Sequence, residues 1–94
     1  SGELSGVGIR LEVNEKNKVL TVVEPIEGSP ALQAGIRSGD RIMAIDGKST
    51  RGMSVEDASN LIRGDVGTTV TLEISRDGSK SFALPLTRAR IELP

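Results

Sequence analysis

Two glycines bracket a single valine just before the first extended stretch of the chain, in the segment Gly6-Val7-Gly8. Glycine adopts backbone conformations with positive φ and leaves neighbouring amide groups uncovered. Such a loop is either a plain turn or a nest of N–H groups that binds an anion. The rest of the sequence has to decide between these two interpretations.

The remaining residue types exclude most other chemistries. The 94-residue chain has no histidine and no cysteine, which rules out a Ser-His-Asp triad, an HExxH zinc site and thiolate metal sites. Glu56 and Asp57 fall in the first turn of a predicted helix, where the helix dipole explains them without acid/base chemistry. Gly6-Val7-Gly8 precedes a strand and not a helix, so the dinucleotide-binding fingerprint fails. We therefore expect no catalytic residues, cofactors or metal in this chain.

Composition narrows the possible partners. The formal net charge is −1 and Phe82 is the only aromatic residue, so neither a basic surface for duplex DNA nor stacking platforms for single strands are available. The length suits one domain, residues 1–94, with a core of Ile, Leu, Val and Ala. We expect no nucleic-acid partner, and a domain that is monomeric by itself.

The pattern of apolar residues predicts mostly short strands. Apolar and polar residues alternate between turn signals over residues 9–13, 19–23, 41–45, 68–76 and 81–86, with a short strand near 48–49 and a further extended run over 87–93. Two helices begin at capping residues, one at Ser29-Pro30 and one at Ser54, and Gly35 and Gly64 are predicted to end them. The predicted fold class is α+β, a small β-rich, partly open barrel of five to six strands with one short and one longer helix.

This arrangement resembles the PDZ domain over nearly the whole chain. Val7-Gly8-Ile9 stands at the place of that family's carboxylate-binding loop, and "SPALQAGIRSGDRIMAIDG" and "SVEDASNLIRG" are similar to its central stretch and its second helix. In the animal-type domain a full strand precedes the loop. Residues 1–5 are too few for a strand and its connection, so we expect a circular permutation. Residues 88–93 would then pair beside the strand that ends the barrel, in the place that the first strand has in the animal-type domain.

The permuted order resembles the PDZ domains of bacterial and organellar proteases. "GVGI" near the start and "LTRARIEL" near the end are most similar to the carboxyl-terminal processing serine proteases, and the alternatives are trypsin-like chaperone-proteases and site-2 membrane proteases. The resemblance implies that the domain is part of a larger Ser-Lys endopeptidase in the periplasm or thylakoid lumen, whose catalytic domain is one of its partners. A scaffold module unconnected with proteolysis is the alternative function.

The resemblance also implies a peptide site. A peptide would add as a strand beside residues 9–13, and its free carboxylate would meet the amides of the loop. On the second helix, an i, i+4, i+7 row faces the groove and Ala58 and Leu61 are expected to face the core. An apolar groove of this kind suits Ala, Val or Leu at the end of the ligand. The predicted peptide-binding residues are Val7, Gly8, Ile9, Arg10, Leu11, Val55, Ser59 and Ile62.

Four arginines are candidates for a second contact to the ligand carboxylate or to a neighbouring protease domain. An ordinary solvated surface role is the alternative for each. They are Arg10, Arg76, Arg88 and Arg90.

Overall fold

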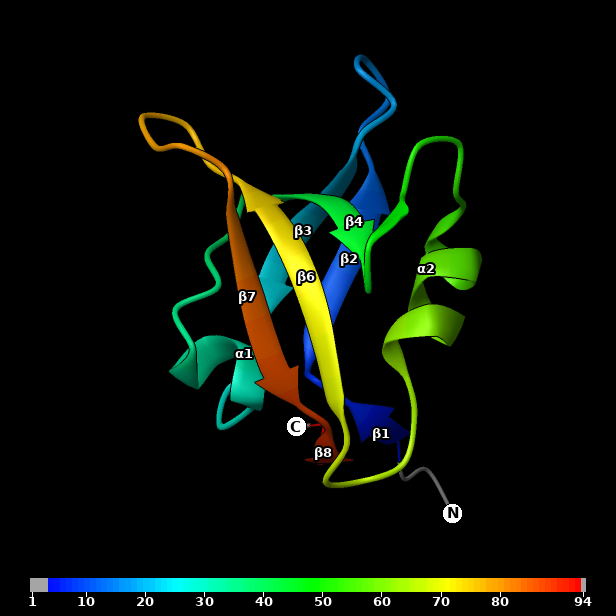
Figure 1. The fold of residues 1–94 in the computed structure, drawn as a ribbon, viewed down its shortest axis with the longest axis vertical. Coiled ribbons are helices and arrows are strands. Elements are labelled where there is room, and N and C mark those ends of the chain that lie inside the picture. The colour runs from blue at the N-terminus through cyan, green and yellow to red at the C-terminus, as the bar shows by residue number, and fades with distance from the viewer. Residues whose placement is uncertain (1–3, 94) are drawn as a thin grey trace.

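The structure, a computed structural model, describes residues 4–93, and two antiparallel sheets organise them (Figure 1). Six strands form the main sheet in the order β2-β3-β4-β6-β7, with β5 paired to β4, and β1 pairs with β8 in a separate two-stranded sheet. The elements are β1 (Leu4–Gly6), β2 (Ile9–Val13), β3 (Leu20–Pro25), α1 (Pro30–Gln33), β4 (Arg41–Ile45), β5 (Lys48–Ser49), α2 (Val55–Ile62), β6 (Thr69–Ser75), β7 (Phe82–Thr87) and β8 (Ala89–Ile91).

The predicted β-rich α+β fold is confirmed, and the main sheet stays open, with β2 and β7 at its two edges. Three of the eight strands have three residues or fewer. The core between the sheet and the helices is aliphatic, as the composition indicated. Its members are Val7, Leu20, Val22, Ala31, Ile36, Ile42, Ile45, Ala58, Ile62, Val70, Leu72, Ile74 and Leu86.

The chain ends differ from the prediction. Residues 4–6 do form a strand, because Val7 and Gly8 join it directly to β2 and no longer connection is needed. Residues 89–91 form the expected strand, but it pairs with β1 and not with the main sheet, with Leu4 opposite Ile91 and Gly6 opposite Ala89. The expected place beside the last strand of the barrel is therefore wrong.

The helix starts follow the predicted caps. The Ser29 hydroxyl accepts a bond from the Leu32 amide at 3.2 Å. At α2 the Ser54 hydroxyl accepts from the Asp57 amide at 3.0 Å, and the Asp57 carboxylate accepts from the Ser54 amide at 3.4 Å, which completes a capping box. Both starts are therefore decided locally by side chains next to each helix.

The two helix ends differ from each other. Gly35 has φ +92°, the left-handed conformation expected after α1. After α2, Arg63 already turns extended with φ −67° and ψ 152°. The helix therefore ends just before Gly64, as predicted, but through the extended Arg63 and not through a left-handed glycine. A Cβ added at position 64 would lie 2.7 Å from Nε of Arg88, so the Arg88 side chain would have to shift.

Candidate peptide-binding site

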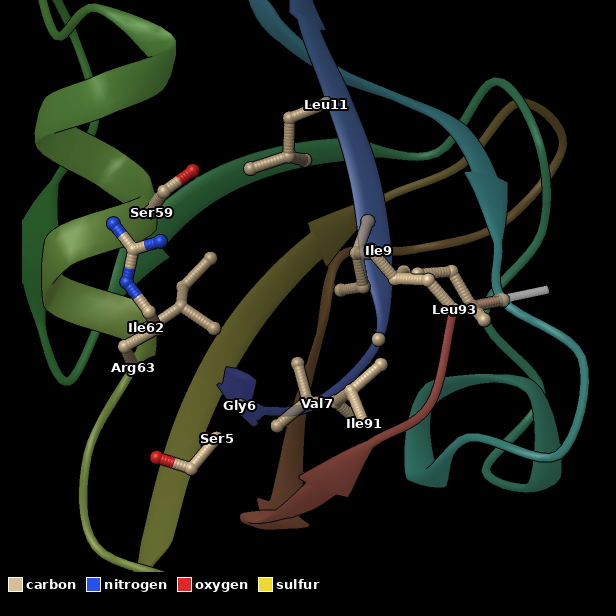
Figure 2. A pocket seen from close by; sticks show the side chains of 12 residues that line it. Ser5, Gly6, Val7, Ile9, Leu11, Ser59, Ile62, Arg63, Ile91 and Leu93 are labelled. Carbon is tan, nitrogen blue, oxygen red and sulfur yellow. The ribbon is translucent and has the colours of Figure 1, made fainter. Parts of the chain in front are cut away.

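Strand β2 offers an open edge beside α2. Within the described residues it is the terminal strand of the main sheet, so β3 occupies only one of its two sides. Figure 2 shows α2 opposite the other side, with Ile9, Leu11, Ser59 and Ile62 directed into the space between them. An unpaired strand edge presents main-chain donors and acceptors to an incoming strand.

A concavity of about 100 Å³, here named the terminal pocket, lies at the start of β2. Its lining is mostly apolar and comes from both chain ends as well as from β2 and α2 (Figure 2). The lining residues are Ser5, Gly6, Val7, Gly8, Ile9, Leu11, Ile26, Ser59, Ile62, Arg63, Ile91 and Leu93.

The loop before β2 is fixed by bonds to its carbonyl groups. The Val7 carbonyl accepts from the Ala31 amide at 2.9 Å, and the Gly8 carbonyl accepts from the Ile26 amide at 2.8 Å. There are no cis peptide bonds among the described residues, and in a trans peptide the N–H points opposite to the C=O. The N–H groups of Gly8 and Ile9 therefore point away from α1 and Ile26, on the pocket side of the loop.

Glycine at position 8 is required twice. Its φ is +83°, a conformation that residues with a side chain rarely adopt. A Cβ placed there would lie 2.2 Å from Cβ of Ser29, far inside contact distance. Ser29 also donates its hydroxyl proton to the Gly8 carbonyl at 3.3 Å. The cap of α1 and the loop thus share one tightly packed junction.

The face of α2 that meets the groove differs from the predicted one. Ala58 is fully buried, as expected, but Leu61 is 36% exposed and Ile62 only 6% exposed. The expected core role of Leu61 is wrong, because α2 is rotated so that residues 58 and 62, one turn apart, face the sheet. Ile62 belongs to the core and lines the terminal pocket as well, so core and groove share one face of the helix.

The other predicted site residues fall into two groups. Val7, Gly8, Ile9, Leu11, Ser59 and Ile62 meet at the terminal pocket. Val55 is half-buried against the core one turn before Ser59 and does not line that pocket. Arg10 lies on the opposite face of β2, where its Nε forms an exposed ion pair with the Glu24 carboxylate at 3.0 Å.

Arg63 is a pocket residue that the sequence reasoning missed. It lies at the end of α2, and its Nη2 donates to Oδ1 of Asn60 at 2.6 Å. Its Cγ is 3.7 Å from where a Cβ of Gly6 would be, so its stem covers the entry to the loop. Position 63 is four residues after Ser59, and that helical spacing could have identified it. Ser5, Gly6, Ile26, Ile91 and Leu93 carry no comparable local signal.

Arg88, near one chain end, and Ser5, near the other, both bond to the end of α2. Nε of Arg88 donates to the Ile62 carbonyl at 2.8 Å and its Nη2 to the Leu61 carbonyl at 3.3 Å. The Ser5 hydroxyl donates to the Gly64 carbonyl at 2.7 Å. A cation on the last carbonyls of a helix satisfies groups that have no partner within the helix. Arg88 is thus a structural residue and not an ordinary solvated one, and it fixes the groove side formed by α2.

Arg76 has a similar structural role at the end of β6, where it contacts the segment between α1 and β4. Its Nε and Nη2 donate to the two carboxylate oxygens of Asp40 at 2.8 and 2.7 Å, and Nη2 also donates to the Gly35 carbonyl at 2.9 Å. Burial alone would raise the pKa of Asp40, but hydrogen bonds from Arg76 and the Arg37 amide and their positive charges lower it below its usual range. The hydrogen bond to Asp40 in turn raises the pKa of Arg76. Neither Arg76 nor Arg90 is among the residues that line the terminal pocket.

Two features are absent from residues 4–93. No group of three or more His, Cys, Asp or Glu side chains in this part of the chain is arranged to hold a metal ion. None of the helices described has the length and apolar character needed to span a membrane.

Comparisons with known proteins agree with this geometry. The family model described as "PDZ domain" matches residues 21–76. A carboxyl-terminal-processing protease of Picosynechococcus sp. is 50% identical over 74 residues, which are 79% of this chain and 18% of the relative. The carboxy-terminal processing protease CtpA of Bacillus subtilis is 45% identical over 84 residues, 89% of this chain and 18% of the relative. The chain thus spans less than a fifth of the length of these two curated relatives.

Solved structures give the same result. The photosystem II D1 C-terminal processing protease matches with a TM-score of 0.90 and 33% identity, over all of this chain and 25% of that one. The PDZ domain of the carboxy-terminal protease from Vibrio cholerae, solved in complex with a peptide, matches with a TM-score of 0.84 and 26% identity, over 97% of this chain and 99% of that one. The chain belongs to the PDZ domain family, and its relatives of similar sequence are carboxyl-terminal processing proteases.

Proposed function

We propose that this PDZ domain captures the free C-terminal tail of a protein as an added strand along β2, with the tail's carboxylate at the N–H groups of Gly8 and Ile9. The carrying observation is the orientation of these two groups, which follows from the bonds to the Val7 and Gly8 carbonyls. Hydrogen bonds to a charged group contribute about 1.5–3 kcal/mol each. An internal peptide segment has no such charge at this place.

The lining of the terminal pocket supports an apolar last residue in the ligand. Ile9, Leu11 and Ile62 surround the place where its side chain would lie. The small volume, about 100 Å³, suits Ala, Val or Leu better than an aromatic ring. Val55, one turn before Ser59 on α2, would contact the ligand residue two positions before the last one.

The position of Arg63 adds one cation to this pocket. Among the lining residues it is the only charged one. In the structure its guanidinium lies beside Asn60 and Ser59 (Figure 2), and because the side chain is exposed it can adopt another rotamer that directs the guanidinium toward the carboxylate. We assign Arg63 the second contact to the carboxylate that sequence reasoning sought among other arginines.

The wider role follows from the relatives. We propose that the domain delivers or gates substrates for a Ser-Lys processing protease of which it is a part, in the periplasm or thylakoid lumen, and that it has no catalytic activity itself. The similarity to processing proteases from cyanobacteria and Bacillus supports this role and an exported location. A peptidase assay of the purified 94-residue chain should show no hydrolysis.

Calorimetry with paired peptides tests the carboxylate site. A peptide ending in Val with a free carboxylate should bind in the micromolar range, about −8 kcal/mol, and its C-terminal amide should bind at least tenfold more weakly. Ser59→Gln, which places a longer side chain in the pocket, should weaken the acid peptide, whereas Asn60→Gln on the neighbouring position should not. Equal affinity for acid and amide would show that the loop is not a carboxylate site.

A further inference from the structure

The main sheet has two terminal strands, and only one of them lies beside α2. That strand is β2, while β7 ends the sheet on the other side, with no strand paired to its outer edge among the described residues (Figure 1). A terminal strand carries main-chain groups that can pair with a further strand. The β7 edge is therefore a second place at which a strand could be added.

Strand β7 lacks most of the features that protect a sheet edge. It is six residues long, and its pairing with β6 has no register shift. Residues 81–87 carry no charged side chain, whereas β2 carries Arg10 and Glu12. Short length, bulges and charged side chains are common protections against further pairing, and β7 has none of the three.

The remaining protection is Pro85, in the middle of β7. Pro85 is opposite Thr71 of β6. The main-chain groups of Thr71 face away from β7, since its carbonyl accepts from the Asp46 amide and its amide donates to the Asp46 carboxylate, both at 2.8 Å. In an antiparallel ladder such a residue exchanges no hydrogen bond with the residue opposite. The main-chain nitrogen and carbonyl of Pro85 therefore point to the free edge.

The neighbouring positions show why a proline is tolerated at this place. The amide of Arg88 donates to the Thr68 carbonyl at 2.7 Å, so every second residue back along β7 bonds to β6, including Leu86 and Leu84. A proline at either of these positions would remove a hydrogen bond within the sheet. At the exposed position 85 it removes a donor only from the free edge.

We propose that Pro85 closes the β7 edge to strand addition, so that the main sheet accepts an added strand only beside β2. Without this proline, β7 would pair antiparallel with β7 of a second copy of the chain, because an uncharged edge meets no charge repulsion from its own copy. A single open edge also keeps any assembly finite, since a sheet that is open at both edges can extend from copy to copy. The inference does not depend on what β2 binds.

Sedimentation velocity of the 94-residue chain over a series of protein concentrations tests this role. Pro85→Thr restores the outward N–H and should dimerise at least about tenfold more tightly than the unchanged chain. Ala83→Thr is the matched control, since it adds a strand-forming residue to the same edge but leaves Pro85 in place. This variant should behave as the unchanged chain does.

A double variant separates the edge from other effects of losing a proline. Ala83→Pro combined with Pro85→Thr moves the proline two residues along the same edge, which should reverse the gain in dimerisation. Thermal melts check that each variant is folded. Pro85→Ala restores the same N–H and replaces Pro85→Thr if that variant does not fold.

Hydrogen exchange locates the contact in the dimer. The amides of Ala83 and Thr87 face the same edge as position 85, and their exchange should slow at least about tenfold in the Pro85→Thr dimer. The amides of β2 should exchange as they do in the unchanged chain.

The contrary outcomes are equally specific. If restoring the N–H at position 85 gives no tighter dimerisation than in the unchanged chain, Pro85 does not close this edge. The same conclusion follows if the double variant associates as strongly as Pro85→Thr, or if the protected amides lie on β2. None of these measurements uses a peptide, so a negative result leaves the proposed tail capture standing.

Discussion

The two ends of the groove are built in opposite ways. At the terminal pocket, Val7 is 1% exposed and the backbone is held by bonds to Ala31 and Ile26. At the other end of β2, the side chains of Met43 and Met53 and the exposed cations Lys18 and Arg51 surround a larger concavity of about 710 Å³. A rigid main-chain site suits a group of fixed geometry, such as the carboxylate proposed to bind there. Flexible methionines adapt to apolar partners of different shape.

Gly8→Ala should have the largest effect, because it breaks the rigid end directly. The left-handed conformation alone costs about 1–2 kcal/mol for a residue with a side chain, and the new Cβ would also clash with Ser29 at 2.2 Å. We expect a strongly lowered melting temperature and loss of peptide binding. Gly28→Ala is the matched control, since Gly28 has φ +75° but no atom within 4 Å of an added Cβ. An equal fall in melting temperature and in peptide affinity for both variants would contradict the tight packing of Gly8 against Ser29.

Ile62→Ala should have the second-largest effect, since Ile62 belongs to the core and also lines the terminal pocket. Truncating a buried aliphatic side chain costs about 2–5 kcal/mol, and the enlarged pocket should shift preference toward bulkier ligand ends. Leu61→Ala, at a neighbouring but exposed position, should cost less than about 1 kcal/mol. Denaturant melts and peptide titrations of both variants measure this contrast. A larger loss of stability for Leu61→Ala would mean that α2 is rotated differently.

Acid should weaken the ion pair that joins the end of β6 to the segment between α1 and β4. The pKa of Asp40 is lower in the folded chain than its ordinary value of 3.8, so its ionised form stabilises the fold above about pH 4, and that contribution is lost as the pH falls through the lower folded value. Melting temperatures between pH 7 and pH 2 should fall less steeply in Asp40→Asn than in the unchanged chain. Asp77→Asn, which alters an exposed ion pair with Arg41, should keep the original slope. An unchanged slope in Asp40→Asn would rule out this contribution.

Arg63→Gln should have the smallest effect, because an exposed charge contributes about 0.2–1 kcal/mol. We expect the preference for acid over amide peptide to fall up to about fivefold. The affinity for the acid peptide should also depend less on salt concentration. Arg10→Gln should leave both unchanged, since Arg10 pairs with Glu24 on the other face of β2. The reverse result would favour the assignment of Arg10 made from the sequence.

Local signals account for what the sequence predicted well. The caps at Ser29 and Ser54 depend on neighbouring residues, and both have the expected structural effect. Gly8 adopts the positive φ that the loop sequence indicated. The rotation of α2, which exposes Leu61 and adds Ile62 to the core, depends on how the helix packs on the sheet. An alternative row with the same helical period was available, so periodicity could not choose between them.

The remaining differences arise from contacts between residues distant in sequence. Arg88 reaches the end of α2 across 26 positions, and Ser5 reaches Gly64 across 59. No local pattern marks either contact. The pairing of β1 with β8 is of the same kind, since a three-residue strand has too little alternation to be recognised alone.

That pairing has a mechanical consequence. Leu4 is opposite Ile91 and Gly6 is opposite Ala89, so tension applied to both chain ends would unzip the two strands one rung at a time instead of shearing all rungs together. Ser5, Gly6 and Ile91 line the terminal pocket, while the main sheet has a ladder of its own. Stretching the domain by its ends would therefore dismantle the pocket before the main sheet, so the proposed tail site would be lost first.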